Sequence, residues 1–455
     1  MLVNSSDVIA ALITPPGRGG VGIVRLSGNN LEPFFNALLG FIPTPRYAHY
    51  QPFLAADGEP IDRGIVLYFS APDSYTGEHV LELQGHGGPV VMDCLLRRVI
   101  ELGARQARPG EFSERAFLNG KMDLTQVEAV ADLIDAGSEQ AARGAIKTLQ
   151  GQFSRRVTEL LEHLIALRVY VEAAIDFPEE EIDFLTDGKV ESGLRGLKKE
   201  LAALLASVSQ GALLREGISV VIAGKPNAGK SSLLNALSGL DTAIVTDVPG
   251  TTRDVLREQI TIDGMPLHII DTAGLRATED TVERKGIERA EGEIKRADQI
   301  LFLVDASKTF DLSADNIFPQ ADADLSQAEN LTFVLNKTDS PAYVGFQAGQ
   351  SKHPVIEISA RTGSGLVELK KHLKKCAGYV NAGEGLFSAR RRHITALSQT
   401  QGCIAQALKQ LLTAGAGELI AEDLKQAQQM LGTITGDYSS DDLLGEIFSS
   451  FCIGK

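Results

Sequence analysis

The segment Gly224-Lys225-Pro226-Asn227-Ala228-Gly229-Lys230-Ser231 has the residue types and spacing of a loop that binds a polyphosphate. Its glycines let the backbone bend so that successive N–H groups point at the phosphates. Lys230 reaches the terminal phosphates, and the Ser231 hydroxyl is a ligand for Mg²⁺. The segment follows the β-branched run 218–222 and opens a Leu-rich helix, whose N-terminal dipole favours an anion. This arrangement predicts a phosphate-binding loop, which is typical of ATPases and GTPases alike.

Three later segments, each at the end of an expected strand, decide between the two nucleotides. Asp271-Thr272-Ala273-Gly274 follows the run 266–270 and offers a carboxylate to the Mg²⁺ shell and a glycine N–H to the γ-phosphate. Asn336-Lys337-Thr338-Asp339 follows 331–335, and Ser359-Ala360-Arg361 follows 355–358, where its backbone fits the guanine oxygen. The Asp339 carboxylate accepts both N–H donors on the Watson–Crick edge of guanine, whereas adenine would leave it unpaired at a cost of roughly 1–3 kcal/mol. The sequence therefore predicts a GTP site.

Leu275 follows the Asp271 segment, at the position where small GTPases often carry a water-orienting glutamine. A leucine cannot hold a water, so either hydrolysis is residual or another group positions the nucleophile. Glu283, in the acidic stretch 279–283, is the best nearby candidate. A solvated helix N-terminus stabilised by its carboxylates is an equally good interpretation of that stretch.

No sequence pattern marks an arginine as the arginine finger that neutralises transition-state charge. Asn227 and the carbonyls of the loop 246–251 can instead cage a monovalent cation, which would supply the same electrostatic effect. Thr251 and Thr252 are alternatives for closing on Mg²⁺ and the γ-phosphate. The residues expected to bind GTP are Asn227, Ala228, Gly229, Lys230, Ser231, Ser232, Thr246, Asp247, Val248, Pro249, Gly250, Thr251, Thr252, Asp271, Thr272, Ala273, Gly274, Asn336, Lys337, Thr338, Asp339, Ser359, Ala360 and Arg361.

Composition bounds the remaining possibilities. The 455 residues leave room for about three domains at ~150 residues each. We expect a cytoplasmic protein, because the sequence holds neither a run of about 18 apolar residues nor a charged-then-apolar leader. The four cysteines (Cys94, Cys376, Cys403 and Cys452) form no C-x-x-C pair, which excludes a zinc ribbon and indicates reduced thiols. The net charge of −15 indicates that any RNA contact is local or supplied by a partner.

The spacing of apolar residues predicts a multidomain α/β protein. Residues 1–118 combine short strand-like runs (8–12, 22–26, 64–68 and 80–83) with glycine-rich turns, which predicts a small α+β domain. Residues 119–214 and 380–455 predict two parts of one helical bundle, with helices broken near Gly137 and Gly151. Residues 215–379 predict a Ras-like P-loop GTPase domain with a mixed sheet, inserted between those parts. A switch motion in the insert would then twist the bundle that carries it.

Further motifs stand along the whole chain: Pro15-Pro16-Gly17-Arg18-Gly19-Gly20-Val21-Gly22, Arg108-Pro109-Gly110-Glu111-Phe112-Ser113, Gly250-Thr251-Thr252-Arg253-Asp254 and the terminal Phe451-Cys452-Ile453-Gly454-Lys455. With these and the Asn227 phosphate loop, the chain resembles the MnmE/TrmE family of tRNA-modifying GTPases from end to end. The resemblance implies an N-terminal tetrahydrofolate-binding domain that dimerises, a discontinuous helical domain and an inserted GTPase domain. It also implies potassium-activated hydrolysis, in which two GTPase domains approach across a homodimer.

The family further implies a partner and a substrate. The partner is the FAD-containing MnmG protein, with which the family forms a heterotetramer and modifies carbon 5 of the wobble uridine in certain tRNAs. The group added is of the aminomethyl type, such as carboxymethylaminomethyl, and its one-carbon unit comes from a tetrahydrofolate.

Site residues follow from the resemblance position by position. It assigns K⁺ to Asn227, Thr246, Val248 and Thr251, Mg²⁺ to Ser231 and Thr252, and the water-positioning role to Glu283. The residues that match the folate contacts of the family are Arg25, Glu82, Lys121 and Lys455. The two carboxylates of a folate tail suit the cationic side chains among them, and a carboxylate such as Glu82 can accept from the donors of the pterin ring. Without the resemblance, Arg25 reads as a solvated strand-end charge and Glu82 as an outward residue of an alternating strand. His79 stands where an acidic residue is expected, so the rim beside the folate motif is expected to differ in detail.

Two further features have competing interpretations. Cys452 is either a packed thiol beside Phe448 and Phe451 or a catalytic nucleophile or proton carrier near the folate. The run Arg390-Arg391-Arg392-His393 is either a solvated helix start or a local phosphate contact. For the whole protein, the alternatives to a modification enzyme are a nucleotide switch in ribosome or RNA assembly and a folate-binding scaffold whose GTPase tightens the dimer.

Overall fold

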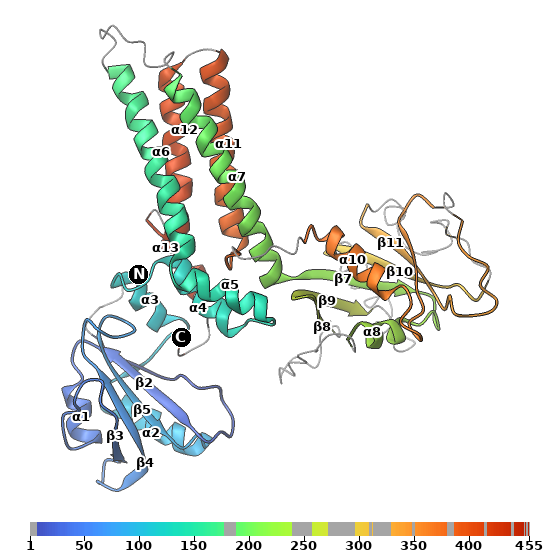
Figure 1. The fold of residues 1–455 in the computed structure, drawn as a ribbon. Coiled ribbons are helices and arrows are strands. Elements are labelled where there is room, and N and C mark those ends of the chain that lie inside the picture. The colour runs from blue at the N-terminus through green and yellow to red at the C-terminus, as the bar shows by residue number, and fades with distance from the viewer. Residues whose placement is uncertain are drawn as a thin grey trace, which may run out of the picture. The chain divides into compact units, whose positions relative to one another are not determined.

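The structure is a computed structural model that describes residues 7–176, 188–238, 257–271, 296–308, 312, 329–347, 351–379, 386–413, 416–437, 441–449, 451 and 454. These residues form two compact units (Figure 1). The first unit comprises residues up to 131, 148–198 and 396–455, and the second comprises 132–147 and 199–395. Four helices have residues in both units: α4 (Leu124–Ile134), α5 (Glu139–Leu149), α7 (Lys189–Glu216) and α11 (Arg391–Thr413).

The first unit contains a six-stranded sheet in the order β3-β4-β5-β2-β1-β6. Its strands are antiparallel except for the pair β1–β6. They are β1 (Ile9–Leu12), β2 (Gly22–Gly28), β3 (His49–Leu54), β4 (Pro60–Phe69), β5 (His79–Gly85) and β6 (Arg105–Gln106). Alternate residues such as Val24, Leu26 and Leu83 are buried against helices α1 (Glu32–Leu38) and α2 (Pro89–Glu101). The strand period of two therefore leaves residues such as Arg25 and Glu82 on the other face of the sheet.

The remaining helices of the first unit are α3 (Glu111–Leu118), α6 (Gln152–Asp176), α12 (Gly417–Thr435) and α13 (Asp441–Ser449). The long helices α6 and α12 pack side by side (Figure 1). Phe448 of α13 and the following Phe451 are buried with Leu124 and Val127 of α4. The end of the chain is therefore packed against the start of the helical segment.

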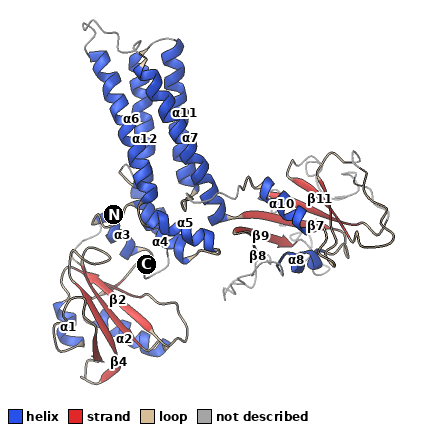
Figure 2. Cartoon of the chain, in the orientation of Figure 1, coloured by secondary structure: helices blue, strands red, loops and turns tan. Residues whose placement is uncertain are grey.

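The second unit contains a sheet in the order β12-β11-β10-β7-β9-β8, in which only β8 and β9 are antiparallel. The strands are β7 (Ile218–Gly224), β8 (Arg257–Ile262), β9 (Met265–Asp271), β10 (Gln299–Asp305), β11 (Leu331–Asn336) and β12 (Val355–Glu357). Helices α8 (Lys230–Ser238) and α10 (Leu366–Cys376) accompany this sheet (Figure 2). Their leucines share one apolar cluster with its strands. Phe302, Phe333 and Ala223 belong to a second cluster, so the central strands are buried on both faces, as expected for parallel strands.

The expected elements are present, with small shifts at their ends. All four strands predicted beside the nucleotide form, and the helices break near Gly137 and Gly151, as predicted. The sequence interpretation missed β3, which carries Pro52, and the short helix α13. Proline lacks an N–H donor and is confined to edge strands, and β3 is indeed an edge strand of its sheet. No helix in the described part of the chain is long and apolar enough to cross a membrane.

Candidate functional site

The phosphate loop connects the end of β7 to the start of α8. Gly224 and Gly229 have φ angles of 144° and 100°, which side-chain-bearing residues rarely adopt. A Cβ atom at Gly224 would lie 2.4 Å from the Leu303 carbonyl oxygen, and one at Gly229 would lie 2.2 Å from Asn336 Nδ2. Both glycines therefore allow close approach as well as a bend. The Lys230 ammonium donates to the Gly224 carbonyl at 3.0 Å, and Ser231 and Ser232 follow in the exposed first turn of α8.

Asn336 joins the phosphate loop to the loop expected at the guanine. Its Nδ2 donates to the Ala228 carbonyl at 2.8 Å, and its Oδ1 accepts from the Ala360 N–H at 3.0 Å. The side chain is only 2 % exposed, so these bonds form away from water, where leaving either group unpaired would be costly. One buried amide thus holds together two of the segments that the sequence predicts at the nucleotide.

Lys337 makes a second cross-link within the same site. It has a left-handed φ of 68°, and its ammonium donates to the Asn227 carbonyl at 2.8 Å and to Asp305 Oδ2 at 2.7 Å. Burial raises the pKa of the Asp305 carboxyl, but hydrogen bonds from Lys337 and Ser307 outweigh burial and place this pKa below its ordinary value of 3.8. The sequence interpretation missed Asp305. A polar residue at the end of the apolar strand 300–304 was the available signal, because ligand sites lie at the carboxyl ends of parallel strands.

Asp339 lies where the Asn336 and Ser359 segments meet. Its Oδ1 accepts from the Ser359 hydroxyl at 2.6 Å, and its other oxygen pairs with Arg361. The hydrogen bond from Ser359 and the Arg361 charge hold the pKa of Asp339 below 3.8, although partial burial opposes them. Asp339 is therefore a carboxylate at neutral pH, the form that accepts two N–H donors from guanine.

The structure thus brings together Asn227, Ala228, Gly229, Lys230, Asn336, Lys337, Thr338, Asp339, Ser359, Ala360 and Arg361, and the Thr338 hydroxyl completes the set by donating to the Ile358 carbonyl at 2.9 Å. Asp271 ends β9, next to β7 in the sheet. Other expected residues lie outside the described part of the chain: Thr246, Asp247, Val248, Pro249, Gly250, Thr251, Thr252, Thr272, Ala273, Gly274, Glu283, Cys452 and Lys455.

Comparison with known proteins identifies the family. The model described as "MnmE helical domain" matches residues 124–452, and that described as "GTP-binding protein TrmE N-terminus" matches residues 8–121. Three relatives carry the name tRNA modification GTPase MnmE. That from Chromohalobacter salexigens is 58 % identical over 99 % of this chain and 98 % of its own length, and that from Marinomonas sp. is 59 % identical over the same shares. The Yersinia pseudotuberculosis relative is 58 % identical over the full length of both chains. This chain belongs to the MnmE/TrmE family.

A solved structure, the G domain of the T. maritima FeoB iron transporter, covers 35 % of the chain at 25 % identity with a TM-score of 0.27. The assignment to the MnmE/TrmE family rests on the full-length relatives and the family models, not on this likeness.

Two of the residues that we expect at a folate site, Arg25 and Glu82, lie on the face of the N-terminal sheet opposite α1 and α2. Arg25 of β2 and Glu82 of β5 stand opposite each other in the register, and Arg25 Nε donates to Glu82 Oε1 at 2.9 Å. Their side chains are 18 % and 13 % exposed, and the Arg25 guanidinium also lies 5.2 Å from the centre of the Tyr75 ring. The interpretation of Arg25 as a solvated charge is therefore wrong, and Glu82, which does face outward on its alternating strand, is paired with Arg25.

Of the other two residues expected at a folate site, Lys121 is described by the structure, and Lys455 lies outside the described residues but follows the described Gly454. Lys121 is exposed, and its stem lies beside Gly77, where a Cβ would meet it at 3.2 Å. Gly454, which precedes Lys455, has a φ of 100° and would place a Cβ 2.7 Å from the Leu12 carbonyl. Leu12 ends β1, and β1 pairs with β2, the strand that carries Arg25. Gly454 therefore lies against the same sheet.

Two expectations change in detail. A 2.7 Å hydrogen bond joins His79 Nδ1 and the Tyr68 hydroxyl. His79 therefore contacts a neighbouring strand from β5, the strand that also carries Glu82. The run 390–393 is not solvated throughout, because Arg390 pairs with Asp132 at 3.1 Å and His393 is 1 % exposed. Arg391 is the exposed member of the run, and it lies 3.7 Å from Glu216.

Proposed function

We propose that this chain is a GTP-hydrolysing enzyme of tRNA modification that acts on carbon 5 of the wobble uridine together with an FAD-containing, MnmG-like partner. The observation that carries the proposal is the joining of the phosphate loop to the guanine loop by Asn336, within a chain that matches MnmE relatives along its full length. A nucleotide switch would need only the GTP site. The N-terminal cluster at Arg25 and Glu82 is a second, separate polar site, which favours an enzyme that also binds a small molecule.

GTP hydrolysis in this proposal depends on Mg²⁺ and K⁺. The exposed Ser231 hydroxyl in the first turn of α8 fits an oxygen-seeking Mg²⁺, with Thr252 as its expected second ligand. Asn227 fits the K⁺ role because its left-handed φ of 65° holds it at the tip of the phosphate loop. The backbone carbonyl of Asn227 accepts a hydrogen bond from Lys337, which fixes the residue in place. Thr246, Val248 and Thr251 would complete the cage. A bound cation supplies positive charge at the β- and γ-phosphates as the bond to the leaving group breaks.

The N-terminal site fits a tetrahydrofolate. Glu82 offers acceptors to the ring donors of a pterin, while Lys121 and the terminal Lys455 offer cations to the folate carboxylates. Tyr75 and Phe112 flank the Arg25 guanidinium at 5.2 and 5.6 Å, so aromatic rings hold the Arg25 side chain in place beside Glu82. When bound, the folate would supply a one-carbon unit for the aminomethyl-type group, and Cys452 would lie three residues from the end of the same tail.

Homodimerisation through the N-terminal domain completes the proposal, because a K⁺-dependent mechanism of this family brings two GTPase domains together. The net charge of −15 implies that the MnmG-like partner supplies much of the tRNA contact. The cytoplasm, where tRNA and reduced thiols occur together, is the expected compartment.

Mass analysis of wobble uridines tests the proposal. In tRNA from cells that lack this protein, the carbon-5 modification should disappear, and it should return when the chain is supplied on a plasmid. An Asp339→Asn variant should fail to restore it, because its amide replaces one of the two acceptor oxygens with an NH₂ donor, which faces the N–H donors of guanine. Unchanged wobble uridines in the deficient cells would contradict the proposal and favour a switch in ribosome or RNA assembly.

A further inference from the structure

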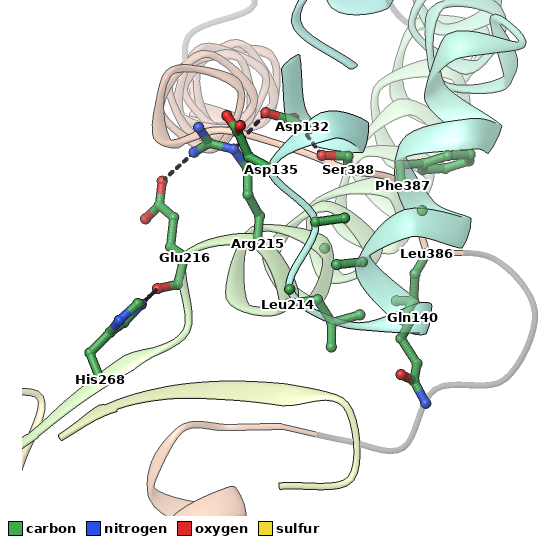
Figure 3. A pocket seen from close by; sticks show the side chains of 15 residues that line it. Asp132, Asp135, Gln140, Leu214, Arg215, Glu216, His268, Leu386, Phe387 and Ser388 are labelled. Carbon is green, nitrogen blue, oxygen red and sulfur yellow. Dashed lines mark hydrogen bonds and ion pairs between the residues drawn. The ribbon is translucent and has the colours of Figure 1, made fainter. Parts of the chain in front are cut away.

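A buried carboxylate ties together the two points at which the chain enters and leaves the GTP-binding fold. Asp132, near the end of α4, accepts hydrogen bonds from Arg215 Nε at 2.7 Å and Ser388 Oγ at 2.5 Å (Figure 3). It also accepts one from Arg390 Nη2 at 3.1 Å. Its side chain is 5 % exposed. Arg215 is the penultimate residue of α7, three positions before β7 begins, and Ser388 and Arg390 lie within three residues of the start of α11. We call these four residues the junction cluster, and all four belong to the second unit.

We propose that Asp132 is a positioning residue through which nucleotide-dependent motion of the GTP-binding fold reaches the helices α4, α7 and α11. Each of these helices continues from the second unit into the first. Asp132 touches neither the nucleotide loops nor the folate matches. Its role is to hold the ends of the three helices in one fixed arrangement, so that a displacement at one end is shared by all.

A continuous set of contacts links the cluster to the nucleotide site. Strand β9 ends at Asp271, the first residue of the segment expected to sense Mg²⁺ and the γ-phosphate. Three residues earlier on β9, His268 Nε2 hydrogen-bonds the Glu216 carbonyl at 2.8 Å. Glu216 follows Arg215 at the end of α7, and its carboxylate pairs with Arg215 Nη1 at 3.2 Å. A shift of β9 along its axis would therefore pull on Arg215, and through Arg215 on Asp132.

The packing around the cluster favours a rigid connection. Helix α7 approaches the returning segment so closely that a Cβ at Gly211 would lie 1.6 Å from the Phe387 carbonyl. On α5, a Cβ at Gly144 would lie 3.3 Å from the Ser388 N–H nitrogen. Close-packed groups of this kind change between discrete arrangements rather than deforming gradually.

The opposite side of the cluster is open. A cavity of about 300 Å³ lies beside it, lined among others by Asp135, Gln140, Leu214, His268 and Leu386. Figure 3 shows Arg215 and Glu216 at its edge, with His268 approaching from β9. The cavity gives side chains at the end of α7 room to change position while the contacts at Gly211 stay closed.

The charges make the contacts of the junction cluster depend on one another. The guanidinium groups of Arg215 and Arg390 share the carboxylate of Asp132, which is 5 % exposed, so loss of one contact changes the balance for the other. Asn at position 132 keeps the shape and the acceptor for Ser388 but removes the charge that holds both arginines. The Asp132→Asn variant therefore tests the positioning role with little change in volume.

Hydrogen exchange of the full-length protein provides the first test, and it requires no tRNA chemistry. A non-hydrolysable GTP analogue with Mg²⁺ and K⁺ should change amide exchange in α4 and α11 of the wild type. In Asp132→Asn the same change should be about 2- to 30-fold smaller, the range in which a coupling residue acts, while affinity for the analogue and the hydrolysis rate stay within about twofold. Asp298→Asn is the matched control, because Asp298 also accepts from a serine hydroxyl and a backbone N–H (Ser219, 2.8 and 2.7 Å) but lies outside the cluster.

The inference also rests on the proposed function, so a second readout measures wobble-uridine modification in cells that carry each variant. Modification should fall about tenfold or more per GTP hydrolysed in Asp132→Asn and stay normal in Asp298→Asn. If Asp132→Asn does not fold, Ser388→Ala replaces it, since this change removes one hydrogen bond and leaves the ion pairs. Exchange in α4 and α11 that responds to the analogue as in the wild type, in whichever variant folds, would overturn the positioning role. Absence of modification in the wild type, with the exchange effect present, would overturn only the proposed function.

Discussion

At the scale of single residues, the nucleotide site is held together by side chains that hydrogen-bond the backbone of the phosphate loop. Asn336 and Lys337 donate to the backbone carbonyls of Ala228 and Asn227, which fixes the loop between Gly224 and Lys230. Their role at the loop is thus to present its N–H groups and the Asn227 side chain in one arrangement. A loop prepared in advance does not lose conformational freedom when the nucleotide binds.

The first residue-scale prediction concerns the cation. If Asn227 belongs to a cage, hydrolysis should be much faster in potassium than in sodium salts, because the cage must match the ionic radius. Asn227→Ala should keep nucleotide binding and lose the potassium effect. Asn227→Gly is the control for the backbone, because a φ of 65° costs alanine roughly 1 kcal/mol or more but costs glycine little. Equal hydrolysis rates of the wild type in the two salts would rule out the cage.

The second residue-scale prediction concerns Glu283. Since Leu275 cannot orient a water, Glu283→Ala should reduce turnover by about 10²-fold or more, the magnitude of a lost acid–base or positioning group. The affinity for GTP should hardly change. Single-turnover hydrolysis and nucleotide titration measure the two quantities separately. Normal turnover in this variant would return Glu283 to the role of a carboxylate at a helix N-terminus.

At the scale of elements, helix α7 offers two glycines in very different surroundings. Gly211→Ala would place a methyl group against the Phe387 carbonyl and should lower the free energy of unfolding by about 1–3 kcal/mol. Gly196→Ala, in the same helix, meets nothing within 4 Å among the described residues and should raise it by about 0.5–1 kcal/mol. Urea unfolding of both variants gives the comparison. Equal effects would show that α7 does not pack on the returning segment.

Helix α3 carries the clearest pH-dependent element. Burial raises the pKa of Glu111, but the Arg105 side chain and the Arg108 N–H outweigh burial, so the pKa lies below its ordinary value of 4.5. A lowered folded-state pKa means that the stabilisation is complete above about 4.5 and is lost as the pH falls from there through the folded-state value. Unfolding midpoints measured between pH 7 and pH 3 should therefore fall less steeply for Glu111→Gln than for the wild type. Glu101→Gln removes an exposed pair 3.4 Å long and should leave the slope unchanged.

The elements also show what the sequence could and could not predict. Local patterns mark the glycines of the phosphate loop and the strands that end in Asn336 and Asp271. The order of these segments and the nucleotide that they bind could therefore be predicted from the sequence. The junction cluster could not be predicted, because the partners of Asp132 lie 83, 256 and 258 residues away and no local pattern marks them. Arg25 and Glu82 were readable only through the family resemblance, since their pairing follows from the register of β2 and β5. Long-range register decides which charges are solvated and which are paired.

At the scale of the whole molecule, the chain places a GTP site in one compact unit and the folate matches in the other. Communication between the two sites therefore has to pass along elements that belong to both units, and the helices α4, α5, α7 and α11 are such elements. Chemistry at the proposed folate site and hydrolysis at the GTP site should then be separable by mutation. The C-terminal tail is the segment on which to test this separation.

Removal of residues 452–455 should leave GTP hydrolysis and self-association near normal and abolish tRNA modification. The physical reason is that Phe451, which stays, supplies the buried apolar contact with Phe448 at 6.0 Å, while Gly454 approaches the Leu12 carbonyl beside the folate matches. Mass analysis of wobble uridines and a hydrolysis assay on the same protein measure the two activities. Cys452→Ser should abolish modification if the thiol acts chemically and should be silent if the tail only packs. Full modification by the truncated protein would refute a functional role of the tail, and the GTP site would then remain as the main output of the chain, as in a nucleotide switch.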